Sequence, residues 1–278
     1  MAITPVDLQV TNITATSERL RWVNALQALI SSLFGASEQG AFYIPRPIVN
    51  GTQALFQDVA GTVPVTADGD PVGRMQDQSG NGNHATQTVS GSRPVYRMDG
   101  TLHWLEFDGV DDALRTTNID FTNTDKMTVV LGVSALGVSN RGLSFVFDLN
   151  DTGEQAVWLG LPSGSGNITA TSSGEGPATA VTESGLTSPL TSVFTVISDI
   201  NAPLLTLRRN AISKGTNTDS QSGGNYADGV FSLGSQSTNS KRFFEGKIYG
   251  LTLRGAETTA PELAQVEQYV AAKTGVTL

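Results

Sequence analysis

The sequence predicts an all-β protein, a sandwich of two packed antiparallel sheets, with one helix before it and a short helix at its end. Glycine and proline are frequent, with 30 and 11 copies, and only 15% of the residues are charged, which is typical of short strands joined by many turns. Many short apolar segments also follow one another, separated by Gly, Asn, Asp and Ser. Because all-β sandwiches reach this size as single domains, we expect one core.

Residues 1–38 are expected to form an attachment segment. Residues 1–16 are polar and lack a sustained period, which favours an extended arm. A helix then begins near Ser17, a residue type favoured at N-caps, and ends at Gly35. The apolar face of this helix contains Trp22, Leu26, Leu29, Ile30 and Leu33.

This apolar face has two interpretations. In the first, the helix packs on its own sandwich. In the second, it mediates self-association into a homo-oligomer, with a trimer as one candidate, or docks into a larger assembly. An arm and an apolar helix before a self-sufficient β domain make a simple attachment device, which favours the second interpretation and makes the five residues a predicted assembly interface.

The predicted sandwich covers residues 39–278. Its candidate strands are short apolar runs bounded by turn-forming residues, at 104–107, 127–133, 143–147, 156–161, 193–198, 204–208, 230–233 and 243–253. No helical pattern interrupts them, which indicates two packed antiparallel sheets. Residues 162–190 are rich in small polar side chains, so this tract is expected to be a long loop or a weak edge hairpin.

A second helix is predicted at the end of the chain. Pro261 stands where proline favours the first helical turn, and Gly275 is placed to stop the helix. The apolar side chains of one face are Leu263, Val266, Tyr269 and Val270. We expect this face to pack against the edge of the sandwich.

Three segments of the predicted sandwich carry a family resemblance. They are residues 54–87, with the D-x-S-G-N-G-N-H piece from Asp77 to His84, residues 105–114 (LEFDGVDDAL), and residues 243–278. Together they resemble the laminin-G-like, concanavalin A-like jelly-roll modules of bacteriophage tail and head accessory proteins. The resemblance implies a jelly roll over residues 40–278 and a role in the virion. Physically, the motifs are mostly turn chemistry, because glycine and asparagine supply left-handed backbone positions.

No enzymatic activity is predicted. A polysaccharide hydrolase of this fold needs two or three carboxylates that alternate along one strand. Glu106, Asp108 and Asp111 form an E-x-D-x-x-D string, but Gly109 follows at once and favours a turn. The two histidines, at positions 84 and 103, lie apart and show no catalytic or metal-binding spacing.

Calcium is the one cofactor that the sequence suggests. One candidate cluster contains Asp108, Asp111 and Asp112, and a second contains Asp148, Asn150, Asp151 and Glu154. Oxygen ligands on loops suit calcium, and modules of the resembled family bind it between loops at the sheet edge. Neither cluster matches a full EF-hand loop, and acidic residues in turns also cap backbone amides.

A glycan site is suggested more weakly. Trp104 and Trp158 lie in candidate strands and are expected to be buried, whereas Tyr226, in QSGGNYADG, lies in a predicted loop. An exposed aromatic ring on a loop stacks on sugars. Tyr226 is therefore the candidate ligand-binding residue.

These observations predict a non-enzymatic virion structural protein, either a tail or fibre module or a capsid decoration. Its expected partners are further copies of itself, other virion proteins and a host surface polysaccharide. A carbohydrate-binding adhesin outside any virion is the alternative, and a polysaccharide hydrolase is the third hypothesis. The net charge of -9 disfavours nucleic acid. No apolar run is long enough to span a bilayer and no signal peptide is recognisable, so the expected location is the virion, made in the host cytoplasm.

Overall fold

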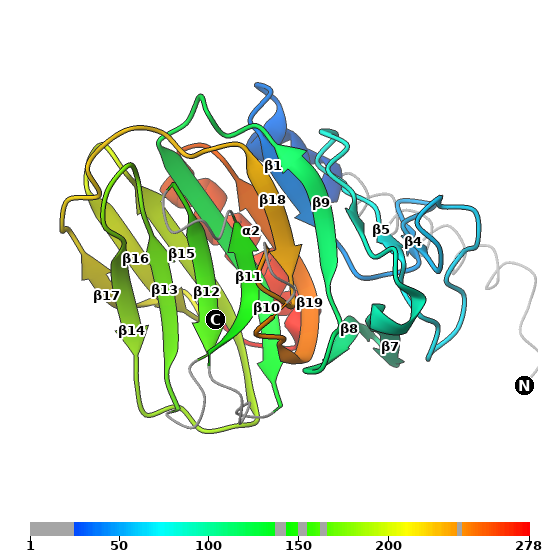
Figure 1. Ribbon diagram of the computed structural model, residues 1–278. Helices are drawn as coiled ribbons and strands as arrows, with labels where there is room; N and C mark the ends of the chain where they lie inside the picture. Colours follow the sequence, from blue (N-terminus) through cyan, green and yellow to red (C-terminus); the bar gives the residue numbers. More distant parts are fainter. Residues whose placement is uncertain (1–24, 137–142, 150–154, 162–165, 238–240) are drawn as a thin grey trace, which may run out of the picture.

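A computed structural model describes residues 25–136, 143–149, 155–161, 166–237 and 241–278. Two large antiparallel sheets face one another, as the sequence predicts (Figure 1). The eight-stranded sheet has the order β17-β16-β15-β10-β19-β8-β7, and β1 also pairs with β19. Its strands are β1 (Gly40–Tyr43), β7 (Val95–Asp99), β8 (Leu102–Asp108), β10 (Lys126–Ala135), β15 (Leu190–Asp199), β16 (Leu204–Arg209), β17 (Ile212–Asn217) and β19 (Glu245–Arg254).

The nine-stranded sheet has the order β14-β13-β12-β11-β18-β9-β6-β5-β4. Its strands are β4 (Leu55–Phe56), β5 (Arg74–Met75), β6 (Ala85–Thr86), β9 (Leu114–Ile119), β11 (Ser144–Leu149), β12 (Val157–Leu161), β13 (Ile168–Ser172), β14 (Thr179–Glu183) and β18 (Gly229–Leu233). The polar tract at 162–190 contributes β13 and β14, so its edge-hairpin interpretation is confirmed. A small hairpin, β2 (Ile48–Val49) with β3 (Thr52–Gln53), and a 3-10 turn, η1 (Ser90–Ser92), complete the β-rich part.

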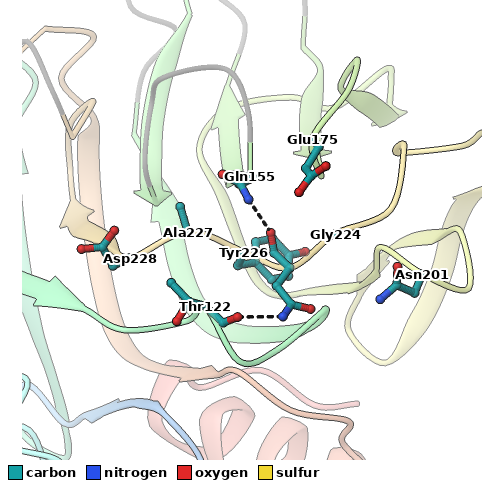
Figure 2. Close-up of a pocket in the computed structure, with 9 residues that line it drawn as sticks. Thr122, Gln155, Glu175, Asn201, Gly224, Tyr226, Ala227 and Asp228 are labelled. Atoms are coloured by element: carbon teal, nitrogen blue, oxygen red, sulfur yellow. Dashed lines mark hydrogen bonds between the residues drawn. The ribbon is translucent and has the colours of Figure 1, made fainter.

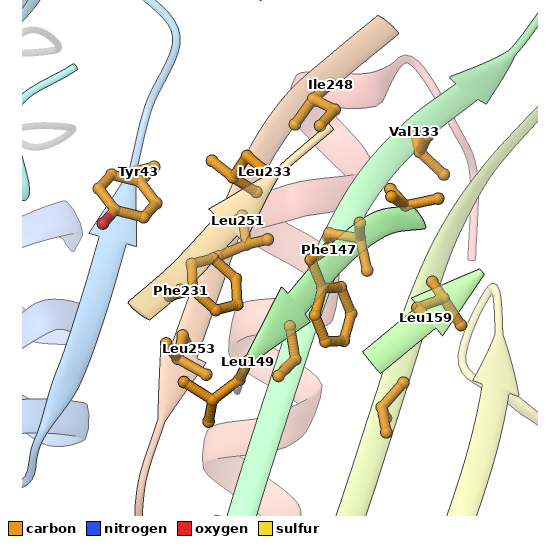
Figure 3. Close-up of a cluster of buried hydrophobic side chains, with 14 of the residues drawn as sticks. Tyr43, Val133, Phe147, Leu149, Leu159, Phe231, Leu233, Ile248, Leu251 and Leu253 are labelled. Carbon is orange, nitrogen blue, oxygen red and sulfur yellow. The ribbon is translucent and has the colours of Figure 1, made fainter. Parts of the chain in front are cut away.

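The main core lies between the two sheets. Alternate side chains of a strand point to opposite faces, and in β10 Val129 and Leu131 enter the core while Val130 points to the other side. Phe147 and Phe231 of the nine-stranded sheet meet leucines of β19 in this layer (Figure 3). This burial of large apolar side chains holds the sheets together.

The outer face of the eight-stranded sheet is covered by helices. The closing helix α2 (Ala260–Thr274) begins with a capping box between Thr259 and Glu262 and ends at Gly275, whose φ is 73°. Helical residues 25–34 lie beside it and share its apolar cluster. None of the helices in the described ranges is long and apolar enough to cross a membrane.

This packing corrects the predicted assembly interface. Leu29, Ile30 and Leu33 are buried, and Leu26 partly so, in a cluster with side chains of β10, β15 and α2. Trp22 lies outside the described residues. The apolar face therefore has a partner within its own chain, which is the first of the two interpretations. The division of the chain at residue 38 stays a prediction.

Arg254, at the end of β19, connects the sheet to both helical segments on its outer face. Its buried guanidinium donates to the Leu33 carbonyl oxygen at 2.7 Å and pairs with Glu38 at 3.0 Å and Glu262 at 3.4 Å. It also donates to the Glu257 carbonyl oxygen. One side chain thus ties residues 25–38 to the start of α2.

Candidate functional site

The D-x-S-G-N-G-N-H motif forms a turn that holds the sheet edge. The Asp77 carboxylate accepts hydrogen bonds from the backbone N–H groups of Phe42, Ser79 and Asn83, at 2.8 to 3.0 Å. The Asp77 N–H in turn donates to Nδ1 of His84 at 3.1 Å. Burial, and then the charge of a neighbouring arginine, lower the pKa of His84. The polar residues of this motif therefore form hydrogen bonds that hold the turn together, as the turn chemistry of the sequence predicts.

The first acidic cluster lies in the turn after β8. Oxygen atoms of Asp108, Asp111 and Asp112 lie within 4.8 Å of one another. Asp108 Oδ1 accepts from the backbone N–H groups of Val110, Asp111 and Asp112, and Asp112 Oδ2 accepts from the Asp108 N–H. Burial, followed by the charge of Asp108, raises the pKa of Asp112 to about 7. Backbone capping therefore accounts for the cluster, and calcium binding by it stays a prediction.

The second acidic cluster lies mainly at positions 150, 151 and 154, outside the described residues. Asp148 itself is fully buried in β11, and its carboxylate accepts from the Ser237 N–H at 2.7 Å. Its position is inside the fold.

Glu106 stands on β8 and belongs to a surface network. Its carboxylate lies 3.9 Å from the Arg97 guanidinium and 3.5 Å from the indole nitrogen of Trp104. Trp104 is buried, as expected. Asp108 caps the following turn, so the two carboxylates bind different neighbours. The absence of enzymatic activity stays a prediction.

An open cavity of about 490 Å³ lies where loops from both sheets meet (Figure 2). The segments that form it follow β9, precede β12, join β13 to β14, join β15 to β16 and precede β18. The lining residues are Thr122, Gln155, Glu175, Asn201, Gly224, Asn225, Tyr226, Ala227 and Asp228. Most of these lining residues are polar.

Hydrogen bonds fix this wall. Asn225 Nδ2 donates to the Thr122 carbonyl oxygen at 2.7 Å, and Gln155 Nε2 donates to the Asn225 carbonyl oxygen at 3.0 Å; both are dashed in Figure 2. The N–H of Tyr226 donates to the Thr124 carbonyl oxygen at 2.9 Å. Three loops from distant parts of the chain are thereby joined before any ligand arrives.

Unusual backbone angles shape the same loops. Gln155 and Ser222 have φ values of 55° and 64°, and Gly223 and Gly224 follow at 69° and 84°. A Cβ on Gly224 would lie 2.8 Å from Cγ of Glu175. Left-handed positions in residues other than glycine are uncommon and often mark functional loops. The consecutive left-handed residues let the 221–228 segment pass close to the Glu175 loop.

Tyr226 lies in this wall, but its ring cannot stack on a sugar. Its side chain is fully buried, and its hydroxyl forms a hydrogen bond of 2.9 Å with the Ser172 hydroxyl, which in turn bonds Ser198. Burial raises the pKa of Tyr226 to about 12. The predicted role as an exposed stacking residue is therefore corrected, because the ring anchors the loop to both sheets. Its neighbours line the cavity instead.

Comparison with known proteins supports the fold. No protein-family model matches the sequence, and no curated protein matches it. Among solved structures, the botulinum neurotoxin serotype D binding domain matches 87% of this chain with a TM-score of 0.58 and 10% identity, and 52% of that chain is covered. The serotype G binding domain matches 71% with a TM-score of 0.55 and 11% identity, covering 49% of that chain.

The serotype D ligand-binding domain in complex with N-acetylneuraminic acid is also similar, with a TM-score of 0.57, 10% identity and coverage of 87% of this chain and 52% of that one. At this identity, the likenesses show a fold, the concanavalin A-like jelly roll. This chain spans about half the length of the toxin domains it matches. These structures have no bearing on the predicted virion role.

Proposed function

We propose that this protein is a carbohydrate-binding module whose ligand occupies the cavity between the loops at 122, 155, 175, 201 and 224–228. The observation that carries the proposal is the construction of this cavity. It is open and polar, and its wall is joined by hydrogen bonds across three segments. A preformed concavity and convergent polar groups that fix orientation are two features of ligand sites.

Two further observations support the proposal. The fold is shared with toxin binding domains, one of which is in complex with N-acetylneuraminic acid. Because this chain spans half of that domain, the likeness supports carbohydrate as a ligand class and does not transfer the particular sugar or its site. Binding without turnover is part of the proposal, since Glu106 and Asp108 are engaged with other groups.

The phage virion role stays a prediction from sequence. One observation behind that prediction was an apolar helix available for docking. The described part of this helix instead packs against its own chain. Carbohydrate binding, the earlier alternative, rests on a site that the fold builds. An adhesin that recognises a host surface glycan would serve on a virion or elsewhere.

A panel of immobilised glycans tests the proposal. The wild-type protein should bind a defined subset, and Asn225→Ala should abolish that binding by removing the bond between two loops. Asp99→Asn is the control, because Asp99 is an exposed carboxylate at the end of β7, in no contact with the cavity wall. Failure of the wild type to bind any glycan, or full binding by a folded Asn225→Ala protein, contradicts the proposal.

A further inference from the structure

The charge of the cavity wall constrains the ligand. Among the described residues that line the cavity, two are carboxylates, Glu175 and Asp228, and none is a lysine, an arginine or a histidine. Both carboxylates are exposed. In Figure 2, Asp228 lies at one end of the loop that carries Gly224 and Tyr226, and Glu175 lies beside the other end. A ligand in the cavity therefore lies in a negative field.

The surroundings deepen this field. Asn201 donates a hydrogen bond to Asp125, and burial first, followed by the charges of Asp199 and Asp125, raises the pKa of the Tyr226 hydroxyl. The ammonium of Lys126 lies 3.1 Å from each of these two carboxylates. The charge of Lys126 is therefore paired with these two carboxylates and does not offset Glu175 and Asp228.

The hydrogen-bonding groups of the wall also constrain the ligand. Each side-chain donor group of the wall has one protein acceptor: Asn225 donates to the Thr122 carbonyl, Gln155 to the Asn225 carbonyl, Asn201 to Asp125 and the Thr122 hydroxyl to Asp120. Each of the three amides keeps one further N–H. Glu175 and Asp228 line the cavity and add carboxylate acceptors, and Oδ2 of Asp228 also accepts from Asn118 at 3.4 Å. The charged groups among the described lining residues are thus acceptors alone, which favours a ligand that brings donors.

We infer that the cavity selects a glycan end that carries hydroxyl groups without a carboxylate, and that it discriminates against sialylated forms. This inference rests on the proposed function. Sugar hydroxyls donate to Glu175 and Asp228, and hydrogen bonds to a charged acceptor are the stronger kind. A sialic acid carboxylate would instead meet two like charges without a cation to pair with, and like charges placed together oppose binding.

Matched glycan pairs test the inference. Each neutral glycan that the wild type binds is titrated beside the same glycan with a terminal sialic acid, at low and at high salt. The neutral form should bind at least about tenfold more tightly, and the difference should narrow as salt screens the wall. The Glu175→Gln/Asp228→Asn protein should lose most of this discrimination and bind the neutral form more weakly.

The matched control carries the same change of charge elsewhere. Asp99→Asn/Glu257→Gln neutralises two exposed carboxylates outside the cavity and should keep the discrimination. Equal or tighter binding of sialylated glycans by the wild type overturns the inference, and so does discrimination that survives in Glu175→Gln/Asp228→Asn. In both cases the proposed function stands if Asn225→Ala still abolishes binding. Absence of binding to every glycan removes both.

Discussion

Single residues shape the cavity through the backbone as well as through side chains. Gly224 holds a φ of 84°, and its missing side chain leaves room for Glu175. The sequence predicts a loop around Tyr226 because glycine and asparagine are typical of turns, and residues 224–228 of this loop line the cavity. The predicted role of Tyr226 was wrong, since the burial of a loop side chain depends on Ser172 and Ser198, which come from other strands.

Gly224→Ala should separate the backbone effect from the effect on the site. The left-handed angle should lower the free energy of unfolding by about 1 kcal/mol, and the new methyl group should displace Glu175 and weaken glycan binding. Gly185→Ala is the control, because Gly185 has a φ of 76° and open space around it. Urea unfolding should show similar losses in both proteins, with weaker glycan binding only in Gly224→Ala. Unchanged binding in Gly224→Ala would contradict this account of the loop.

Asp112 should make stability depend on pH. Its pKa is raised to about 7 in the folded protein, above the value of about 3.9 in an unfolded chain. The folded state therefore binds more protons at Asp112 between these values, so the contribution of Asp112 to stability is most favourable below pH 4 and becomes less favourable as the pH rises to 7. Asp112→Asn keeps an acceptor for the Asp108 N–H and should be more stable than wild type at pH 8, by about 1–2 kcal/mol.

Urea unfolding in the presence of a chelator measures this difference, which should vanish at pH 4. An equal pH dependence in both proteins would show that Asp112 titrates normally. The same experiment with added calcium tests the metal prediction, because an ion held by Asp108, Asp111 and Asp112 would stabilise the wild type and not Asp112→Asn.

Helices and strands could be predicted where a local sequence pattern alone determines them. The core strands β10, β15 and β19 are long segments rich in apolar residues, and α2 has a proline near its start and a glycine at its end. Strands of two residues, such as β5 and β6, carry too few side chains to show a period. β9 is polar in its middle, and Thr116 is buried there because its hydroxyl bonds the Phe231 backbone of β18.

The ion pair between α2 and the eight-stranded sheet tests how the closing helix is held on the sheet. Glu267 is buried and accepts from Arg208 at 2.9 and 3.1 Å and from Thr195 at 2.8 Å. Arg208→Met should cost about 3 kcal/mol, because it leaves a buried carboxylate without its partner. Arg208→Met/Glu267→Met should recover most of that loss. Urea unfolding measures the difference. If Arg208→Met is as stable as Arg208→Met/Glu267→Met, the ion pair does not contribute to stability.

The whole molecule depends on contacts that no local pattern reveals. β10 pairs with β15 and with β19, both distant in sequence, and the cavity gathers five separate segments. The resemblance in three motifs indicated the jelly roll, so the fold could be predicted. The cavity could not, because its wall depends on which loops meet at one end of the sandwich. The same limit explains why the apolar helix was assigned to assembly and not to its own sheet.

Deletion of residues 1–38 should now destabilise the sandwich. It removes Leu29, Leu33 and Phe34 from the outer face and exposes Val130 and Val193. Leu33→Ala alone should cost about 2–4 kcal/mol, whereas Gln27→Ala, at an exposed position, should cost little. Thermal unfolding of the three proteins measures this. A truncated protein that melts with the full chain would restore the interpretation of this helix as an attachment device.

The central claim is that the cavity binds carbohydrate, and nuclear magnetic resonance tests it at the residues themselves. A neutral glycan selected from the panel is titrated into the isotope-labelled full chain, and backbone amide shifts are followed. The account predicts saturable shifts at Glu175, Asn201 and residues 224–228, with little change around Asp108 and Asp112. Shifts confined to another surface, or no shifts at concentrations where the panel shows binding, would contradict it.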